Sequence, residues 1–138
     1  MLAGMDLEWL RRHCLSFPHA TEHLQWESLV FKVGGKLFAI AALEPARVWL
    51  SFKSTPEECA ELIEIPGVIP APYLARAHWV ALETEDALPR NELKQRLRRS
   101  YDLILAGLPR KTRETLAASS SRKRTPQPAI RADRRNPE

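Results

Sequence analysis

The chain has 138 residues, of which 44% are hydrophobic and 28% are charged, a composition that fits one domain with a packed core. No apolar run approaches the roughly 20 residues that a membrane-spanning helix requires. The start of the sequence also lacks the long apolar stretch of a secretory signal. We therefore expect a cytoplasmic protein with no membrane partner, whose two cysteines, Cys14 and Cys59, are reduced thiols in or near the core.

The net charge of +4 is unevenly distributed along the chain. Residues 1–116 hold 15 Lys or Arg and 15 Asp or Glu, so this part is formally neutral. Residues 117–138 hold six basic residues against two acidic ones and carry the whole excess. From about residue 118 the sequence has too few apolar groups to offset the entropy of ordering it. We therefore predict a folded domain over 1–117 and a basic disordered tail over 118–138.

The first half of the chain predicts a helix and a hairpin. Apolar residues recur at helical spacing over about 7–15, with an acidic residue in the first turn and basic residues later, as the helix dipole favours. Two β-rich runs, 29–33 and 36–41, flank Gly34 and Gly35. Two glycines between such runs indicate a tight turn in which both central residues have positive φ.

The second half has a clear helix start at Thr55, where a capping box is followed by Pro56 at the first helical position. The prolines within 65–72 exclude a central strand there, because proline has no N–H to donate to a neighbouring strand. The predicted elements are a helix over 56–64, a strand over 78–83, a long helix from about 89 to 107 and a short helical extension over 111–117.

These elements predict the fold class. Strands joined as hairpins dominate, and the sequence lacks the strand–helix–strand alternation of a parallel sheet. We therefore expect an α+β domain in which an antiparallel sheet carries its helices packed on one face.

The segment His19-x-x-Glu22-His23 matches the H-x-x-E-H pattern of inverted zinc peptidases. That chemistry needs both histidines on one helical face to hold the metal, with the glutamate as base. Pro18 precedes the pattern and a hairpin follows it closely, so we favour a polar connecting loop. No other catalytic, phosphate-binding or paired-cysteine pattern occurs, and we expect a protein that is not an enzyme and uses no metal or cofactor.

A third strand is predicted over 47–53, where apolar and polar residues alternate strictly. Its polar face carries Arg47, Trp49 and Lys53. An aromatic ring between cations can stack on bases while the cations contact phosphates. The alternative is that Trp49 is covered by a helix or by a second copy of the chain.

A second aromatic and basic cluster joins the proline-rich segment to the next strand. It contains Tyr73, Arg76, His78 and Trp79. Such a segment is suited to a binding wing, and the alternative is a structural edge with Trp79 in the core. The nucleic-acid hypothesis is completed by basic residues nearer the end of the chain, namely Lys111, Arg122, Lys123 and Arg124.

Three segments, Leu29–Ala39, Pro72–Val80 and Ser100–Lys111, resemble the MmcQ/YjbR family, and the resemblance spans roughly residues 5–116. It implies a two-layer fold similar to that of the frataxin homologue CyaY. It also implies DNA binding through strands and loops that act as wings, and it brings no catalytic residues. Ala75 and Ala77 stand where many members have polar or basic residues, which removes positive charge from the proposed contact region.

We therefore predict a non-enzymatic protein that binds DNA or RNA, with phosphate contacts supplied largely by the tail. The alternative is a protein-interaction or small-ligand domain that uses the Trp49 face as an anchor, in a monomer or weak dimer. An iron-binding role by analogy with frataxin ranks below both, because the first predicted helix lacks an acidic ridge.

Overall fold

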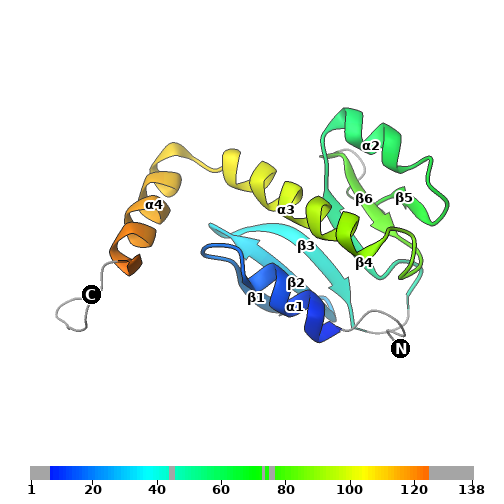
Figure 1. The fold of residues 1–138 in the computed structure, drawn as a ribbon, viewed down its shortest axis with the longest axis horizontal. Coiled ribbons are helices and arrows are strands. Elements are labelled where there is room, and N and C mark those ends of the chain that lie inside the picture. Colours follow the sequence, from blue (N-terminus) through cyan, green and yellow to red (C-terminus); the bar gives the residue numbers. More distant parts are fainter. Residues whose placement is uncertain (1–6, 44–45, 73, 75–76, 125–138) are drawn as a thin grey trace.

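The computed structural model describes residues 7–43, 46–72, 74 and 77–124 (Figure 1). No helix among these residues is both long enough and apolar enough to cross a membrane. The elements follow one another along the chain as α1 (Leu7–Leu15), β1 (Thr21–Gln25), β2 (Ser28–Val33), β3 (Lys36–Ala42), β4 (Leu50–Lys53), α2 (Pro56–Leu62), β5 (Val68–Pro70), β6 (Trp79–Leu82), α3 (Arg90–Ala106) and α4 (Arg110–Arg124).

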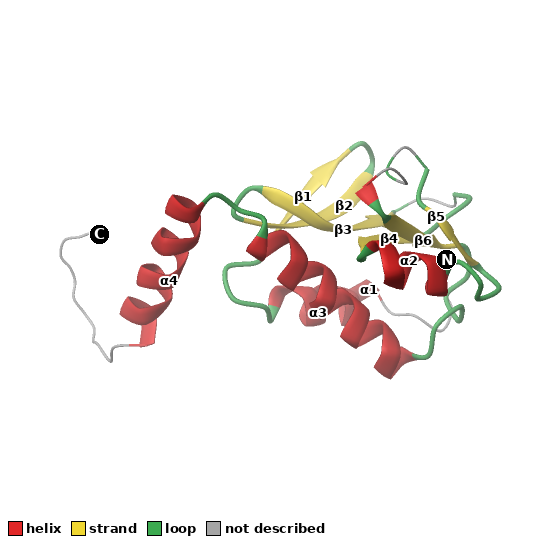
Figure 2. Ribbon diagram, turned by 90° about the horizontal axis from the view of Figure 1, so that it is seen from above, coloured by secondary structure: helices red, strands yellow, loops and turns green. Residues whose placement is uncertain are grey.

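The six strands form one antiparallel sheet in the order β1-β2-β3-β4-β6-β5. Figure 2 shows α1, α2 and α3 on the same face of this sheet. The predicted α+β class, with an antiparallel sheet and helices on one face, is confirmed. The closer likeness to CyaY stays a prediction.

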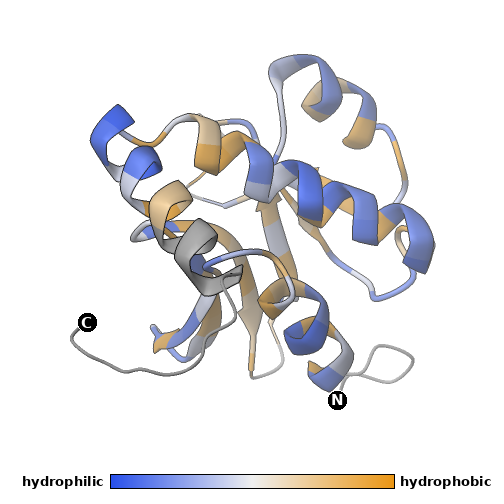
Figure 3. Cartoon of the chain, turned by 60° about the vertical axis from the view of Figure 1, so that its left-hand side comes forward, coloured by the Kyte–Doolittle hydropathy of each residue, from blue (hydrophilic) through white to orange (hydrophobic). Residues whose placement is uncertain are grey.

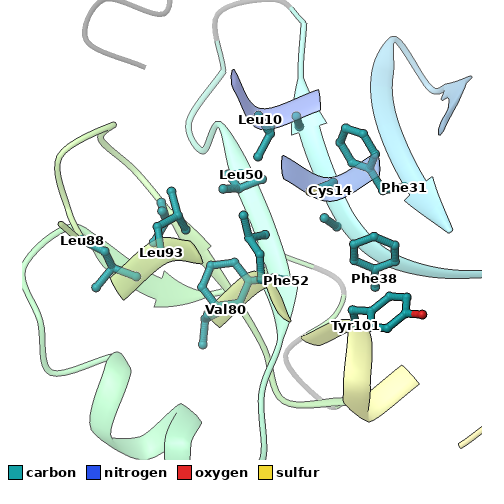
Figure 4. Packing of buried hydrophobic residues seen from close by; sticks show 14 of the residues in the cluster. Leu10, Cys14, Phe31, Phe38, Leu50, Phe52, Val80, Leu88, Leu93 and Tyr101 are labelled. Atoms are coloured by element: carbon teal, nitrogen blue, oxygen red, sulfur yellow. The ribbon is translucent and has the colours of Figure 1, made fainter. Parts of the chain in front are cut away.

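The main core lies between the sheet and these three helices (Figure 4). The apolar stripe of α3 contributes Leu93, Leu97 and Tyr101, all fully or almost fully buried. Burial raises the pKa of the Cys14 thiol, which lies within this core on α1. Cys59 packs against the same core, and both cysteines are free thiols, as predicted.

Ser100 of α3 forms hydrogen bonds to a β-bulge in β3 and to β4, and so links the helix to the sheet. Phe31 pairs with Ala39 but Lys32 pairs with Leu37, so Phe38 is an extra residue and joins Ala39 in the core. The buried Ser100 hydroxyl of α3 donates to the Phe38 carbonyl (2.7 Å) and accepts from the Lys53 amide (2.9 Å). One α3 side chain thereby holds β3 and β4 together.

Two-residue turns close both ends of β2. At one end Gly34 and Gly35 have φ values of +59° and +84°, as the sequence predicts. A Cβ on Gly34 would come within 2.5 Å of Leu108 Cδ1, so this turn packs tightly against the α3–α4 junction. At the other end Trp26 and Glu27 adopt φ values of +52° and +61°, although neither is a glycine.

A smaller cluster lies on the opposite face of the sheet. It consists of Ala71, Trp79 and Ala81, with partly buried side chains such as Ile40 and Leu74 packed against it. Strand alternation explains this arrangement, because Ala81 lies between Val80 and Leu82, which belong to the main core. Ala71, Leu74 and Trp79 thus cover part of the face that carries no helix.

The structure differs from the predicted elements in three places. β1 occupies residues that the sequence assigns to a loop, and β4 begins at Leu50 rather than at residue 47. α4 runs from Arg110 to Arg124 and so continues past the predicted domain boundary at 117. The split into a domain and a tail stays a prediction, and residues 125–138 lie outside the described part of the chain.

Other predicted features are confirmed. Thr55 caps α2 with a complete capping box, and Pro56 begins the helix. The proline-rich segment forms β5, a three-residue strand at the edge of the sheet and not at its centre. α3 ends at Ala106, directly before Gly107 and shortly before Pro109.

Candidate nucleic-acid interface

The two C-terminal helices carry most of the positive charge of the described chain. Residues 90–124 contain eleven Lys or Arg and three Asp or Glu, a net charge of +8. Residues 1–89 contain seven basic and twelve acidic residues, a net charge of −5. Dividing the chain at residue 117 conceals this separation, because it adds the basic helix α3 to an acidic body.

The exposed face of α3 follows from its helical period. Its buried residues face the sheet, so positions 94, 95, 98, 99 and 102 turn toward solvent. These residues line one shallow hollow, and Figure 3 shows that much of α3 is hydrophilic. The hollow is lined by Lys94, Gln95, Arg98, Arg99 and Asp102.

The two arginines that line the hollow, Arg98 and Arg99, each form one ion pair through Nε. Arg98 Nε lies 3.1 Å from Asp102 Oδ1, and Arg99 Nε lies 3.0 Å from Glu58 Oε2 on α2. Pairs this exposed are worth about 0–1 kcal/mol, so a phosphate can compete for the guanidinium groups. Lys94 and Lys111 are exposed and make no ion pair with the described residues. We call the exposed cations Lys94, Arg98 and Arg99 of α3 and Lys111 of α4 together the basic helical surface, of which Lys111 lies outside the hollow.

The prediction that Trp49 lies on an exposed strand face is wrong. Its side chain is 8% exposed and belongs to the main core, and its Nε1 donates to the Thr84 carbonyl (2.9 Å). Trp49 precedes β4, and both Trp49 and Leu50 contribute to the main core, so strict alternation fails at this point. The indole is therefore not available to stack on a base.

The two cations predicted beside Trp49 are accessible but do not form a continuous surface with it. Arg47 is 72% exposed, and its Nε lies 3.7 Å from Glu83 Oε2. Lys53 is partly exposed, and its ammonium group donates to the Ala77 carbonyl (2.7 Å). Both remain candidates for phosphate contacts without an aromatic platform between them.

The second predicted cluster is only partly described. Tyr73 and Arg76 lie outside the described residues. His78 has φ +65°, and its carbonyl accepts from both the amide (3.0 Å) and the hydroxyl (2.9 Å) of Ser54. Trp79 is 5% exposed in the smaller cluster, which confirms the structural alternative for this residue.

The remaining predicted contacts fall on α4. Lys111 is exposed in its first turn, whereas Arg122, Lys123 and Arg124 continue the helical backbone to its end. Sequence reasoning missed Lys94, Arg98 and Arg99. A helical projection of residues 90–106 would have found them, because the apolar stripe fixes which positions face solvent.

The H-x-x-E-H pattern does not form the helix that zinc chemistry requires. Glu22 and His23 lie on β1, where successive side chains point to opposite faces. Arg11 binds the Glu22 carboxylate with two hydrogen bonds (2.8 and 2.6 Å), which lower the pKa of Glu22. Among the described residues, no group of three His, Cys, Asp or Glu side chains could hold a metal ion.

Comparison with known proteins identifies relatives along most of the chain. The protein YjbR of Escherichia coli K12, described as uncharacterized, is 29% identical over 116 residues, which cover 81% of this chain and 98% of the relative. The crystal structure of DR2400 from Deinococcus radiodurans, with a DUF419 domain, has 30% sequence identity and a TM-score of 0.72, and it covers 80% of this chain and 87% of that one.

A protein of Pseudomonas syringae shares the fold at 19% identity, with a TM-score of 0.60 over 72% of this chain and 99% of its own. The YjbR family model matches residues 15–103, from the end of α1 into α3. The names of these relatives specify no activity. The match over more than half of the sequence establishes that this chain belongs to the YjbR family.

Proposed function

We propose that this protein binds nucleic acid, without catalysis, through the basic helical surface of α3 and α4. The observation that carries the proposal is the separation of charge, +8 on residues 90–124 against −5 on residues 1–89. A basic surface on an otherwise acidic body orients the protein toward a polyanion. The surface differs from the predicted one, because Trp49 and Trp79 are buried.

The chemistry of this surface favours phosphate contacts over base contacts. Lys94 and Lys111 present ammonium groups, and Arg98 and Arg99 retain terminal guanidinium nitrogens without hydrogen bonds to described residues. Such contacts neutralise phosphates and release counterions but carry no sequence information. We therefore expect weakly selective binding of DNA or RNA that depends steeply on salt.

The test is fluorescence anisotropy of a labelled duplex with the full chain at several salt concentrations. With about four phosphate contacts, the affinity should fall on the order of 10²-fold between 50 and 200 mM salt. The double variant Lys94→Gln/Lys111→Gln should bind more weakly and reduce the log–log salt slope by about 2. Its matched control is Arg47→Gln/Lys53→Gln, which removes the same charge from the strand face predicted earlier.

The outcomes separate the two surfaces. A smaller slope for Lys94→Gln/Lys111→Gln and a nearly unchanged slope for the control support the proposal. A larger loss of affinity for the control would place the nucleic-acid site on the strand face instead. The proposal is overturned if the full chain does not bind at about 50 mM salt, or if it binds and neither pair changes the slope.

A second candidate function is protein binding at the β1–β2 hairpin. Leu24 and Trp26 are 73% and 71% exposed, and β1 is an edge strand with one side unpaired in the sheet. Exposed apolar side chains beside an open strand edge are typical of a protein-interaction site. Sedimentation of the full chain at rising concentration, compared with Leu24→Thr/Trp26→Ser, tests for self-association here. Identical sedimentation of the two proteins as monomers would exclude a dimer at this edge.

A further inference from the structure

A pocket beside the basic helical surface has a different chemical character. It lies between the segment after α1, the C-terminal half of α3 and the start of α4, and its volume is about 280 Å³. Arg98 lines both this pocket and the hollow on α3. The side chains that line it are Pro18, His19, Arg98, Tyr101, Leu105, Arg113, Leu116 and Ala117.

Two guanidinium groups supply the positive charge of the pocket. The Cζ atom of Arg98 lies 5.2 Å from the centre of the Tyr101 ring, while its Nε pairs with Asp102. Arg113 Nε donates to the Leu108 carbonyl (3.1 Å), and Arg113 has no carboxylate partner among the described residues. In both arginines the terminal nitrogens, which suit two-point binding of an oxyanion, make no hydrogen bond to a described residue.

His19 adds a polar atom that lacks a protein partner. Its Nε2 is shielded from solvent and makes no hydrogen bond with the described residues. His19 also has φ +65°, a conformation that costs energy in a residue other than glycine. A shielded ring nitrogen without a partner is unfavourable. His19 also lines the pocket, so a rotation of its ring on ligand binding would give this nitrogen a partner.

The rest of the lining is apolar. Leu105, Leu116 and Ala117 form the helical walls, and the Tyr101 ring is held in place by its hydroxyl, which donates to the Pro18 carbonyl (2.7 Å). Burial raises the pKa of Tyr101, so the phenol stays neutral and does not repel an anion. A free phosphate ion would leave this apolar lining unused, whereas an anion with an apolar body would fill it.

We propose that this pocket binds a small organic anion, in which a carboxylate or phosphate group is held by Arg98 and Arg113 and an apolar or aromatic body packs against Tyr101, Leu105 and Leu116. The volume limits the ligand to about the size of one substituted ring. The site shares Arg98 with the basic helical surface, but Arg113, His19 and the apolar lining lie outside that surface. Binding of a small anion can therefore succeed or fail independently of nucleic-acid binding.

The test is an NMR titration of the full, ¹⁵N-labelled chain with phenyl phosphate. Three further ligands are compared with it. Benzoate replaces the phosphate by a carboxylate, inorganic phosphate lacks the apolar body, and benzyl alcohol is a ring without charge. We expect a Kd on the order of 1 mM for phenyl phosphate or benzoate. Inorganic phosphate and benzyl alcohol should bind at least about tenfold more weakly, since each meets only half of the site. The amide shifts should centre on residues 19, 101, 105 and 113.

Three variants distinguish the pocket from general charge attraction. Arg113→Gln, which keeps a donor for the Leu108 carbonyl, should weaken phenyl phosphate binding at least about fivefold. Arg110→Gln removes the same charge one turn earlier on α4, outside the pocket, and should leave the affinity unchanged. His19→Asn, which tolerates positive φ, should also weaken binding. Equal losses for Arg110→Gln and Arg113→Gln, or equal binding of inorganic phosphate, would overturn the proposal, as would shifts that avoid the pocket.

Discussion

The two turns at the ends of β2 share a backbone conformation but differ in sequence and surroundings. Gly34 and Gly35 turn beside the buried Leu108, whereas Trp26 and Glu27 turn in solvent. Positive φ costs glycine nothing, but costs other residues about 1–2 kcal/mol each. The packed turn therefore carries the residues that folding requires. The exposed turn contains two residues that folding alone disfavours, and the exposed Trp26 is its side chain best suited to contact another molecule.

The largest expected effect is on the free energy of unfolding, from a substitution in the packed turn at Gly34. Gly34→Ala adds a Cβ within 2.5 Å of Leu108 and imposes positive φ on alanine. We expect the free energy of unfolding to fall by about 2–4 kcal/mol, from backbone strain and overpacking together. Urea unfolding followed by circular dichroism measures this change.

Gly35→Ala is the matched control for that variant. Gly35 also has positive φ, but a Cβ there meets no atom within 4 Å. Its cost should be limited to about 1–2 kcal/mol of backbone strain. Equal losses for the two variants would mean that the Leu108 contact contributes nothing, and the contrast between the turns would reduce to glycine conformation alone.

An intermediate effect of opposite sign is expected at the exposed turn. Trp26→Asn/Glu27→Gly installs the residues that this turn type prefers and should raise the free energy of unfolding by about 1–2 kcal/mol. The urea midpoint should rise with an unchanged m-value. If stability falls instead, Trp26 or Glu27 makes a stabilising contact that outweighs the strain.

The smallest effect concerns pH and the attachment of β1 to α1. Hydrogen bonds from Arg11 and its charge lower the folded-state pKa of Glu22 below its usual value of 4.5. The pair therefore stabilises the fold fully above about pH 4.5, and this stabilisation is lost as the pH falls through the folded-state pKa. Urea unfolding between neutral and acidic pH should show a flatter decline for Glu22→Gln. Parallel curves would show that the pair contributes nothing.

Much of the fold could be predicted because its signals are local. The Gly34–Gly35 turn, the Thr55 capping box and the apolar stripe of α3 each combine residue types that few other structures accommodate. β1 was missed because Thr21–Gln25 is polar, and because its turn to β2 has no glycine. Its position as an edge strand depends on pairing with β2, which a local pattern does not show.

The candidate site was harder to predict than the fold. Trp49 was placed on the polar face because alternation was extended to residues that precede β4. Only the packed structure shows that its ring points into the core and that its nitrogen reaches Thr84. The charge of α3 was equally hidden, because acidic residues far away in the sequence cancel it in any count over the whole domain.

The two edges of the sheet have a consequence for polymerisation. β5 is only three residues long and ends in Pro70, which has no N–H to offer an incoming strand. β1, at the opposite edge, is a five-residue strand without proline. Sheet-to-sheet growth into a filament needs two competent edges, and among the described strands only β1 provides one. Strand pairing between copies would therefore stop at a closed pair, joined β1 to β1, and would not propagate into fibres.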